Sequence, residues 1–338
     1  MAGAKWGQKI QIGKETTASG TAIAATNVLR GDGGTISDDH DLVFISERVG
    51  VTTPSIRTMT PKLLASLDMA ATPATFEQLP YIGEAGIGVE SPTQDGSGSD
   101  YIYAYTIPYN AVNTLATYTL ECGDNQQAEE MEYGFVESFK LSGGGGEAVI
   151  MSAKWIGRQV TKTSFTGSIA VPTVEEILST GEFYIDAIGG SIGSTAIEAT
   201  LLSWELSIDT GWGPKFTADS GQKYFQSLHW SADRFKGELK VTMEHNASAV
   251  AQKDAWIAET PKLVRLLIEG SDVTTAGTTY SAKTLILDMV GKWEKFEPLG
   301  DEDGNSTYDA TFRIGWDEGA STTNPFTMTV VNELSALT

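Results

Sequence analysis

The chain has 338 residues, of which 41% are hydrophobic, 44 are acidic and 23 are basic, and its formal net charge is −21. This length is sufficient for two or three domains with hydrophobic cores, and the composition excludes a chain that is disordered throughout. The charge balance leaves no basic patch that could hold nucleic acid by neutralising phosphates, so a tight nucleic-acid binder is excluded.

The cysteine and apolar content restrict the compartment. Cys122 is the single cysteine of the sequence, which excludes an internal disulfide and fits assembly in a reducing cytoplasm. Residues 1–14 contain no apolar run, and no later stretch approaches the length of a membrane span. We therefore expect neither a secretion signal nor contact with a membrane.

The secondary structure is expected to be mostly antiparallel β. Residues 1–28 are rich in glycine, threonine and alanine and are expected to form an extended N-terminal arm. Alternating or β-branched and aromatic stretches predict strands at 63–69, 101–107, 116–120, 135–141, 148–156, 202–208, 239–243, 263–268, 284–290 and 307–314. Helices are predicted at 75–85, 173–178 and 250–259, and Pro80 limits the first to a short or kinked element.

The sequence contains an internal repeat. Blocks in the first half have similar partners in the second: 67–69 at 241–243 (174 residues later), 81–84 at 256–259 (175), 137–139 at 294–296 (157) and 156–157 at 314–315 (158). The fall in spacing predicts that the second copy lacks 18 residues between its helix and its hairpin. We expect two tandem domains, 29–172 and 173–338, each mainly β with one flanking helix.

No motif of the sequence indicates catalysis, a cofactor or a metal, and we expect no enzyme. Gly143–Gly146 lies between two predicted strands without a following Gly-Lys-Ser/Thr, which favours a hairpin turn over a phosphate loop. The acidic counterpart Asp301–Asn305 resembles the start of a calcium loop, but Phe312 stands where the twelfth-position glutamate is required. The three histidines have no partner at a metal-ligand spacing.

One long connection is rich in large aromatic residues. Residues 211–236 contain Trp212, Tyr224, Phe225 and Trp230, which would leave an apolar patch on an isolated subunit. We expect these four side chains to contact another subunit, together with residues 1–28 and the loop 46–61. The alternative is that the segment folds back over the core of its own domain.

The sequence resembles the tail tube proteins of long-tailed, siphovirus-like bacteriophages. The similar stretches are 12–22, the helix 75–81, the strand 136–139, and the pair 183–186 and 202–204. The resemblance implies a β-sandwich with a flanking helix, in which each domain gives about four strands to a barrel around a channel. Such rings carry six domains, so a two-domain chain implies three chains per ring, with a hexameric ring as the alternative.

The resemblance implies a structural virion protein, assembled in the bacterial cytoplasm, whose stacked rings form the hollow tube through which DNA passes. Its implied partners are further copies of itself, the tail terminator, tape measure and tail tip proteins, and double-stranded DNA in transit without specific binding. No cofactor is implied. An acidic channel would repel DNA and leave it mobile.

Other functions remain open from the sequence. The main alternative is a two-domain β-sandwich adhesin or receptor-binding protein that holds glycans with exposed tryptophan and tyrosine side chains. A capsid decoration or tail terminator protein, and a glycoside hydrolase with an unrecognised acidic pair, are further alternatives.

Overall fold

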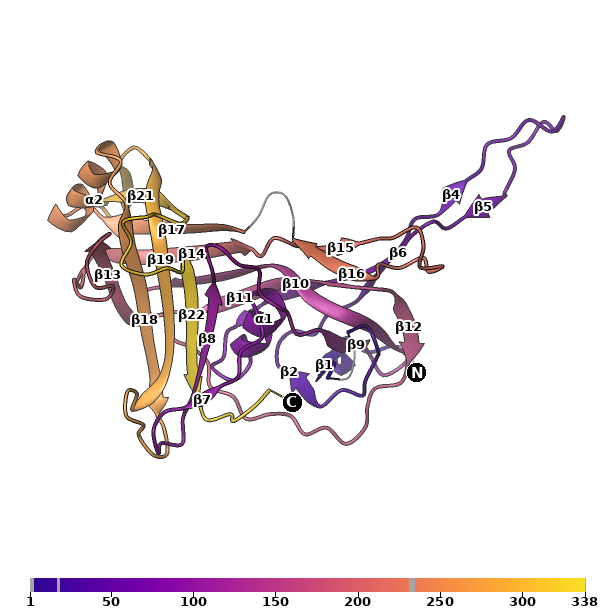
Figure 1. Cartoon of the computed structure of the whole chain (residues 1–338), viewed down its shortest axis with the longest axis horizontal. Helices are drawn as coiled ribbons and strands as arrows, with labels where there is room; N and C mark the ends of the chain where they lie inside the picture. The colour runs from indigo at the N-terminus through magenta and orange to yellow at the C-terminus, as the bar shows by residue number, and fades with distance from the viewer. Residues whose placement is uncertain (1–2, 17–18, 231–234, 338) are drawn as a thin grey trace.

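The computed structural model describes residues 3–16, 19–230 and 235–337. Its described part is mainly β, with large antiparallel sheets and two α-helices (Figure 1), which confirms the predicted fold class at that level. All ten predicted strands are present, several of them longer than expected.

A long antiparallel sheet crosses the molecule. Its spatial order is β3 (Ser37–His40), β6 (Leu63–Pro73), β11 (Ile150–Gly157), the second half of β10 (Ala128–Gly144), β14 (Leu201–Asp209), β17 (Lys236–Glu244) and β21 (Asn305–Ile314), followed on β21 by the end of β19 (Ala282–Phe296) and by β20 (Gly300–Glu302). Side chains alternate along these strands: Leu67, Leu141 and Leu239 are fully buried, while their sequence neighbours are polar and more exposed. One face of the long sheet therefore packs on the core and the other is open.

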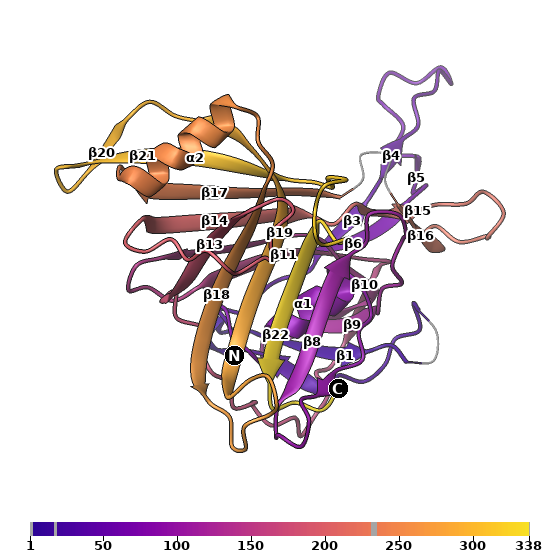
Figure 2. The ribbon, with the colours of Figure 1, turned by 60° about the vertical axis from the view of Figure 1, so that its left-hand side comes forward.

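Two further sheet segments pack behind the long sheet and share its longest strands. The first contains β2 (Asn27–Leu29), β1 (Lys9–Lys14), β9 (Tyr118–Gly123), the first half of β10, and β12 (Val160–Thr163). The second contains β13 (Gly181–Ala187), β18 (Lys262–Asp272), the first half of β19, β22 (Phe326–Asn332), β8 (Tyr101–Ile107) and β7 (Thr93–Gln94). In Figure 2 the strands of this second segment run across those of the long sheet.

The strand pairings of the first part of the chain recur in the second. Six pairings have counterparts in the same chain order: β1–β9 with β13–β18, β9–β10 with β18–β19, β10–β12 with β19–β22, β10–β11 with β19–β21, β11–β6 with β21–β17, and β6–β3 with β17–β14. Both β10 and β19 also contain a bulge, at Glu137 and at Glu294, residues 157 apart as in the aligned blocks.

Within the described residues, two strand pairings join these two sets of strands. β10 pairs with β14, which makes the long sheet continuous between them. β8 follows the first helix in the chain but pairs with the C-terminal strand β22. The connection 258–261 of the second set is only a short turn and contains no strand like β8.

The helices differ from expectation in their bounds. Helix α1 (Leu79–Gly86) begins next to Pro80, which is tolerated in a first helical turn because the N–H group that it lacks would have no partner there. Helix α2 (Ala247–Ile257) begins earlier than predicted because the side chain of Asn246 accepts a hydrogen bond from the backbone of Ala249.

The prediction of a helix at 173–178 is wrong. This stretch is extended and forms single bridges from Glu176 to Thr75 and from Leu178 to Ala148. Ile177 is fully buried between these bridges. Burial of this side chain and backbone pairing on two sides hold the segment extended despite its helix-compatible sequence.

The N-terminal region also differs from expectation. Residues 9–14, expected within an extended arm, form β1 between β2 and β9. Ile10 and Ile12 are buried in the main core, so this part of the N-terminal region belongs to a sheet. It is preceded by the short helix η1 (Lys5–Gly7).

Two hairpins extend from the body (Figure 1). The longer contains β4 (Val43–Phe44) and β5 (Thr58–Met59), and the other contains β15 (Trp212–Lys215) and β16 (Ser227–Trp230).

Candidate functional site

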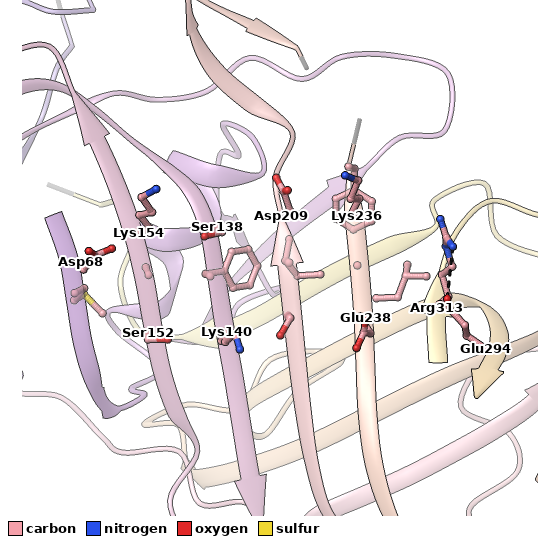
Figure 3. Close-up of a pocket in the computed structure, with 18 residues that line it drawn as sticks. Asp68, Ser138, Lys140, Ser152, Lys154, Asp209, Lys236, Glu238, Glu294 and Arg313 are labelled. Atoms are coloured by element: carbon pink, nitrogen blue, oxygen red, sulfur yellow. Dashed lines mark ion pairs between the residues drawn. The ribbon is translucent and has the colours of Figure 1, made fainter. Parts of the chain in front are cut away.

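The open face of the long sheet carries many polar and charged side chains, which come from seven of its strands. Two adjoining hollows of about 680 and 710 Å³ lie on it. Figure 3 shows the first hollow, with labelled side chains from β6, β11, β10, β14, β17, β19 and β21 standing in rows across the strands. The charged residues that line the two hollows are Lys140, Lys154, Lys236, Lys240, Lys295 and Arg313 among the cations, and Asp68, Glu147, Glu205, Asp209, Glu238, Glu294, Glu297 and Asp309 among the carboxylates.

The cations of this face lie against carboxylates. Glu205 on β14 is 3.5 Å from the Nζ of Lys140 on β10 and 3.7 Å from the Nζ of Lys240 on β17. Lys240 is also 3.4 Å from Glu238. These four residues form a chain of alternating charge across β10, β14 and β17, in which each cation has a carboxylate within ion-pair distance.

The two bulges place a glutamate on the same face. Glu137 is 2.7 Å from the Nζ of Lys154, and Glu294 is 3.8 Å from Arg313. A bulge changes the direction of a side chain, which brings each glutamate beside a basic residue of the adjoining strands. The hydrogen bond and charge of Glu137 raise the pKa of Lys154, so this lysine stays protonated at neutral pH.

The charge of this face differs from what the total charge suggested. The chain carries −21 overall, whereas the two hollows of this face together are lined by six cationic and eight carboxylate side chains. The first hollow is lined by four cationic and four carboxylate side chains. The period-two pattern of polar residues in the predicted strands could have indicated this face, but only sheet pairing brings opposite charges together.

The two outer strands of the long sheet have unused edges within the described residues. β3 pairs with β6 on one side only. At the other end, the last residues of β19 pair with β21 on one side only. All residues of β3 are exposed, as is Lys295 at the opposite end, where Glu297 is half-buried. Such edges offer unpaired backbone groups to another strand.

The aromatic segment 211–236 partly covers its own chain. Phe225 is fully buried in a small cluster with Leu115, Tyr133 and Phe135. Arg158 holds this part of the segment by donating to the carbonyl oxygens of Phe225 (2.9 Å) and Gln226 (3.1 Å). The structure thus buries Phe225 within its own chain, because an apolar ring gains more from this pocket than from water.

The other three aromatic residues of the segment are half-buried. Trp212 and Trp230 face each other across the β15–β16 hairpin, with ring centroids 5.1 Å apart in an edge-to-face arrangement. Tyr224 lies over the guanidinium of Arg158, 5.1 Å from its centre. Their contact with another subunit stays a prediction.

The β4–β5 hairpin carries the most exposed apolar side chains outside the body. Phe44 is 64% exposed and Ile56 89% exposed. Leu42, Val49, Val51 and Met59 along the same hairpin are also exposed. The predicted contact loop 46–61 lies within this hairpin.

The turn predictions agree with the backbone. Residues 145–149 connect β10 to β11, and Gly146 in this connection has φ 80°. The acidic tip connects β20 to β21, with Asp303 at φ 51° and Gly304 at φ 85°, a conformation that glycine adopts readily. Both tips act as hairpin turns.

Among the described residues, no group of three or more histidine, cysteine, aspartate or glutamate side chains is arranged to hold a metal. No described helix is both long and apolar enough to span a membrane. Cys122 is buried. The sequence matches no protein-family model and no curated protein at a significant level.

Proposed function

We propose that this chain is a tube-forming subunit of a phage tail, with two tandem tail-tube domains and three chains per ring. The repeated scheme of six strand pairings supports the division into two equivalent domains. The structure suggests bounds of about 9–163 and 181–332 for them, because β1 and β13 are the first strands of the two schemes and β12 and β22 the last.

The observation that carries the proposal is the junction between β10 and β14. In spatial order, the first scheme gives the long sheet β3, β6, β11 and β10, and the second gives it β14, β17, β21 and β19. The junction therefore pairs the final strand of the first set with the initial strand of the second. The corresponding strands at the two ends of the sheet are β19 and β3, and their outer edges are unused in one chain. A second copy can repeat the β10–β14 junction by placing its β3 beside β19.

Closure of a ring accounts for both edges at once. An open sheet of this length exposes backbone groups at each end, which makes a single chain prone to edge-to-edge association. A closed ring pairs every edge. Six domains in a ring require three of these chains, and the polar face of the long sheet then lines the channel.

The exposed hairpin supplies a contact between rings. The apolar residues of β4–β5 project beyond the body on a ribbon too thin to bury them itself (Figure 1). Stacked rings would cover them. The polymer then forms the hollow tail tube of a virion, through which double-stranded DNA passes.

Electron microscopy of the purified protein tests the proposal. We expect hollow tubes built of rings with three chains each. Rings of six chains would overturn the trimer, and a protein that stays monomeric at high concentration would overturn the tube. The latter result would favour a glycan-binding adhesin, for which the stacked, exposed pair Tyr109 and Trp316 offers an aromatic platform.

A further inference from the structure

The carboxylates of the polar face are placed so that they neutralise its cations. Lys140, Lys240, Lys154 and Arg313 are between 44% and 70% exposed, so each is accessible from the open side of the sheet. Each nevertheless has a glutamate at 2.7 to 3.8 Å. Three glutamates, Glu137, Glu205 and Glu294, contact all four of these cations.

Stability gives little reason for this arrangement. Exposed ion pairs contribute only about 0–1 kcal/mol each to folding. The pairs also join strands that are already held together by backbone hydrogen bonds. The consequence of the pairing lies in what the face presents to a charged molecule in front of it.

DNA binds a protein without sequence preference when unneutralised cations replace the counterions of its phosphates. A lysine or arginine already neutralised by a carboxylate gives no such gain, because the phosphate must displace the carboxylate. A fully acidic face would instead repel DNA over roughly 8 Å, the screening length in physiological salt. Paired charges give a third condition, in which DNA is neither held nor strongly repelled.

We propose that the polar face of the long sheet is a non-adhesive surface for double-stranded DNA, on which Glu137, Glu205 and Glu294 mask four cations. The inference rests on the proposed function, since it takes this face as the one that meets DNA. It attributes DNA mobility to local masking of cations and not to the total charge of −21.

The test removes the carboxylates that neutralise Lys140, Lys154 and Arg313 without altering the cations, while Lys240 keeps Glu238 at 3.4 Å. The variant Glu137→Gln, Glu205→Gln, Glu294→Gln is compared with a control triple, Glu198→Gln, Glu269→Gln, Glu318→Gln. The control glutamates are exposed, lie outside both hollows, and give the same change in total charge. Binding of a fluorescent duplex of about 30 base pairs is measured by anisotropy at several salt concentrations, with far-UV spectra to establish that both variants are folded.

We expect no binding by the wild-type protein or the control triple at physiological salt. The face triple should bind at least about ten-fold more tightly than the control at low salt, with a slope of log affinity against log salt of about −3, as expected for about three phosphate contacts. Equal affinity of the two triples, or tight binding by the wild type, would overturn the masking. The assay needs no assembly, so absence of tubes in microscopy would overturn the proposed function separately.

Discussion

At the scale of single residues, the carboxylate of Glu84 shows how a charge is accommodated in the core. Glu84 lies on α1 and is 1% exposed. The Nζ of Lys14 donates to it at 2.5 Å, and the hydroxyl of Tyr118 also donates to it. Burial and the Glu84 charge raise the pKa of Tyr118 far above its usual range, so the hydroxyl keeps its proton and acts as a donor.

Removal of the cation should be costly at this position. Lys14→Met leaves a buried carboxylate without its counter-charge, and we expect a loss of about 3 kcal/mol in the free energy of unfolding. Urea denaturation measures the loss. Lys162→Met, at an exposed position, is the control and should change stability by less than about 0.5 kcal/mol. Equal effects of the two substitutions would contradict a structural role for Lys14.

Asp100 is a second buried carboxyl group, and its surroundings differ from those of Glu84. It is 0% exposed, and neither of its oxygens has a hydrogen-bond partner within the described part of the chain. Burial, together with the charges of Asp95 and Glu333, raises its pKa. A raised carboxyl pKa means that the folded protein holds the proton more tightly than the unfolded chain, so stability falls as pH rises from the ordinary aspartate pKa through the raised one.

Asp100→Asn should therefore stabilise the protein at pH 7, by about 1 kcal/mol, which is the lower end of the cost of a buried polar group without a partner. The gain should shrink as pH falls below the ordinary aspartate pKa, because the wild-type carboxyl is then protonated in both states. Thermal unfolding at pH 7 and pH 3.5 measures both values. The exposed Asp301→Asn should show no such pH-dependent gain, and a gain that is constant with pH would contradict the assignment.

At the scale of elements, the two projecting hairpins differ in what anchors them. The segment after β15 is fixed to the body by Phe225 and by the hydrogen bonds from Arg158. The β4–β5 hairpin has exposed apolar side chains along its length and no buried residue between 41 and 62. One hairpin is therefore part of the fold, whereas the other is available for contact.

Phe225→Ala should destabilise the isolated chain. Loss of a fully buried phenylalanine leaves a cavity and costs about 3–5 kcal/mol. The neighbouring Tyr224→Ala removes a half-buried ring and should cost clearly less. The midpoint and slope of urea unfolding of the unassembled protein give both values, and equal small effects would place Phe225 in an interface instead.

Shortening the β4–β5 hairpin should prevent stacking but not folding. Replacement of residues 45–57 by Asn-Gly joins β4 to β5 through a two-residue turn and removes Val49, Val51 and Ile56. We expect an unchanged thermal midpoint and loss of tubes in electron microscopy. Thr52→Ala with Thr53→Ala, at exposed positions in the same hairpin, is the control and should still give tubes. Tubes of normal length from the shortened protein would contradict the role of the hairpin in stacking.

At the scale of the whole molecule, the two schemes define how one copy should meet the next. Equivalent positions can be followed across the sheet from the residue that lies two positions before each bulge. In the first scheme, the residues paired from strand to strand are Phe135, Ile156, Ser66 and Ser37. In the second scheme they are Lys292, Arg313, Glu238 and Ser207. Ser37 therefore corresponds to Ser207, which pairs with Lys140 in the β10–β14 junction. Glu297 corresponds to Lys140, since each follows its bulge glutamate by three positions.

Ser37→Cys combined with Glu297→Cys should cross-link neighbouring copies. We expect disulfide-linked species that stop at three chains under mild oxidation, read on a non-reducing denaturing gel. The buried Cys122 leaves little background reaction. Ser37→Cys with Leu299→Cys, two positions further along the chain, should link poorly, and neither single variant should form species larger than a dimer. A ladder that continues to six chains would contradict the three-chain ring.

The sequence by itself determined the elements. Alternating apolar residues predicted the ten strands. The strands that were not predicted include β3, which is short and charged, and also β22, which is apolar and β-branched and could have been recognised from its sequence. It also indicated the repeat, because aligned residues such as Glu137 and Glu294 occupy the same bulge in two copies of one pairing scheme. Local spacing is sufficient for these features, since they depend on neighbours in the chain.

Only the tertiary structure decided which strands are neighbours and which faces are open. It extended residues 173–178 against two other segments, paired β8 with the distant β22, and buried Phe225 beneath its own chain. It also assembled Lys140, Glu205 and Lys240 from three strands into one chain of charges. Such arrangements depend on burial and pairing between residues far apart in sequence, which no local pattern of side chains specifies.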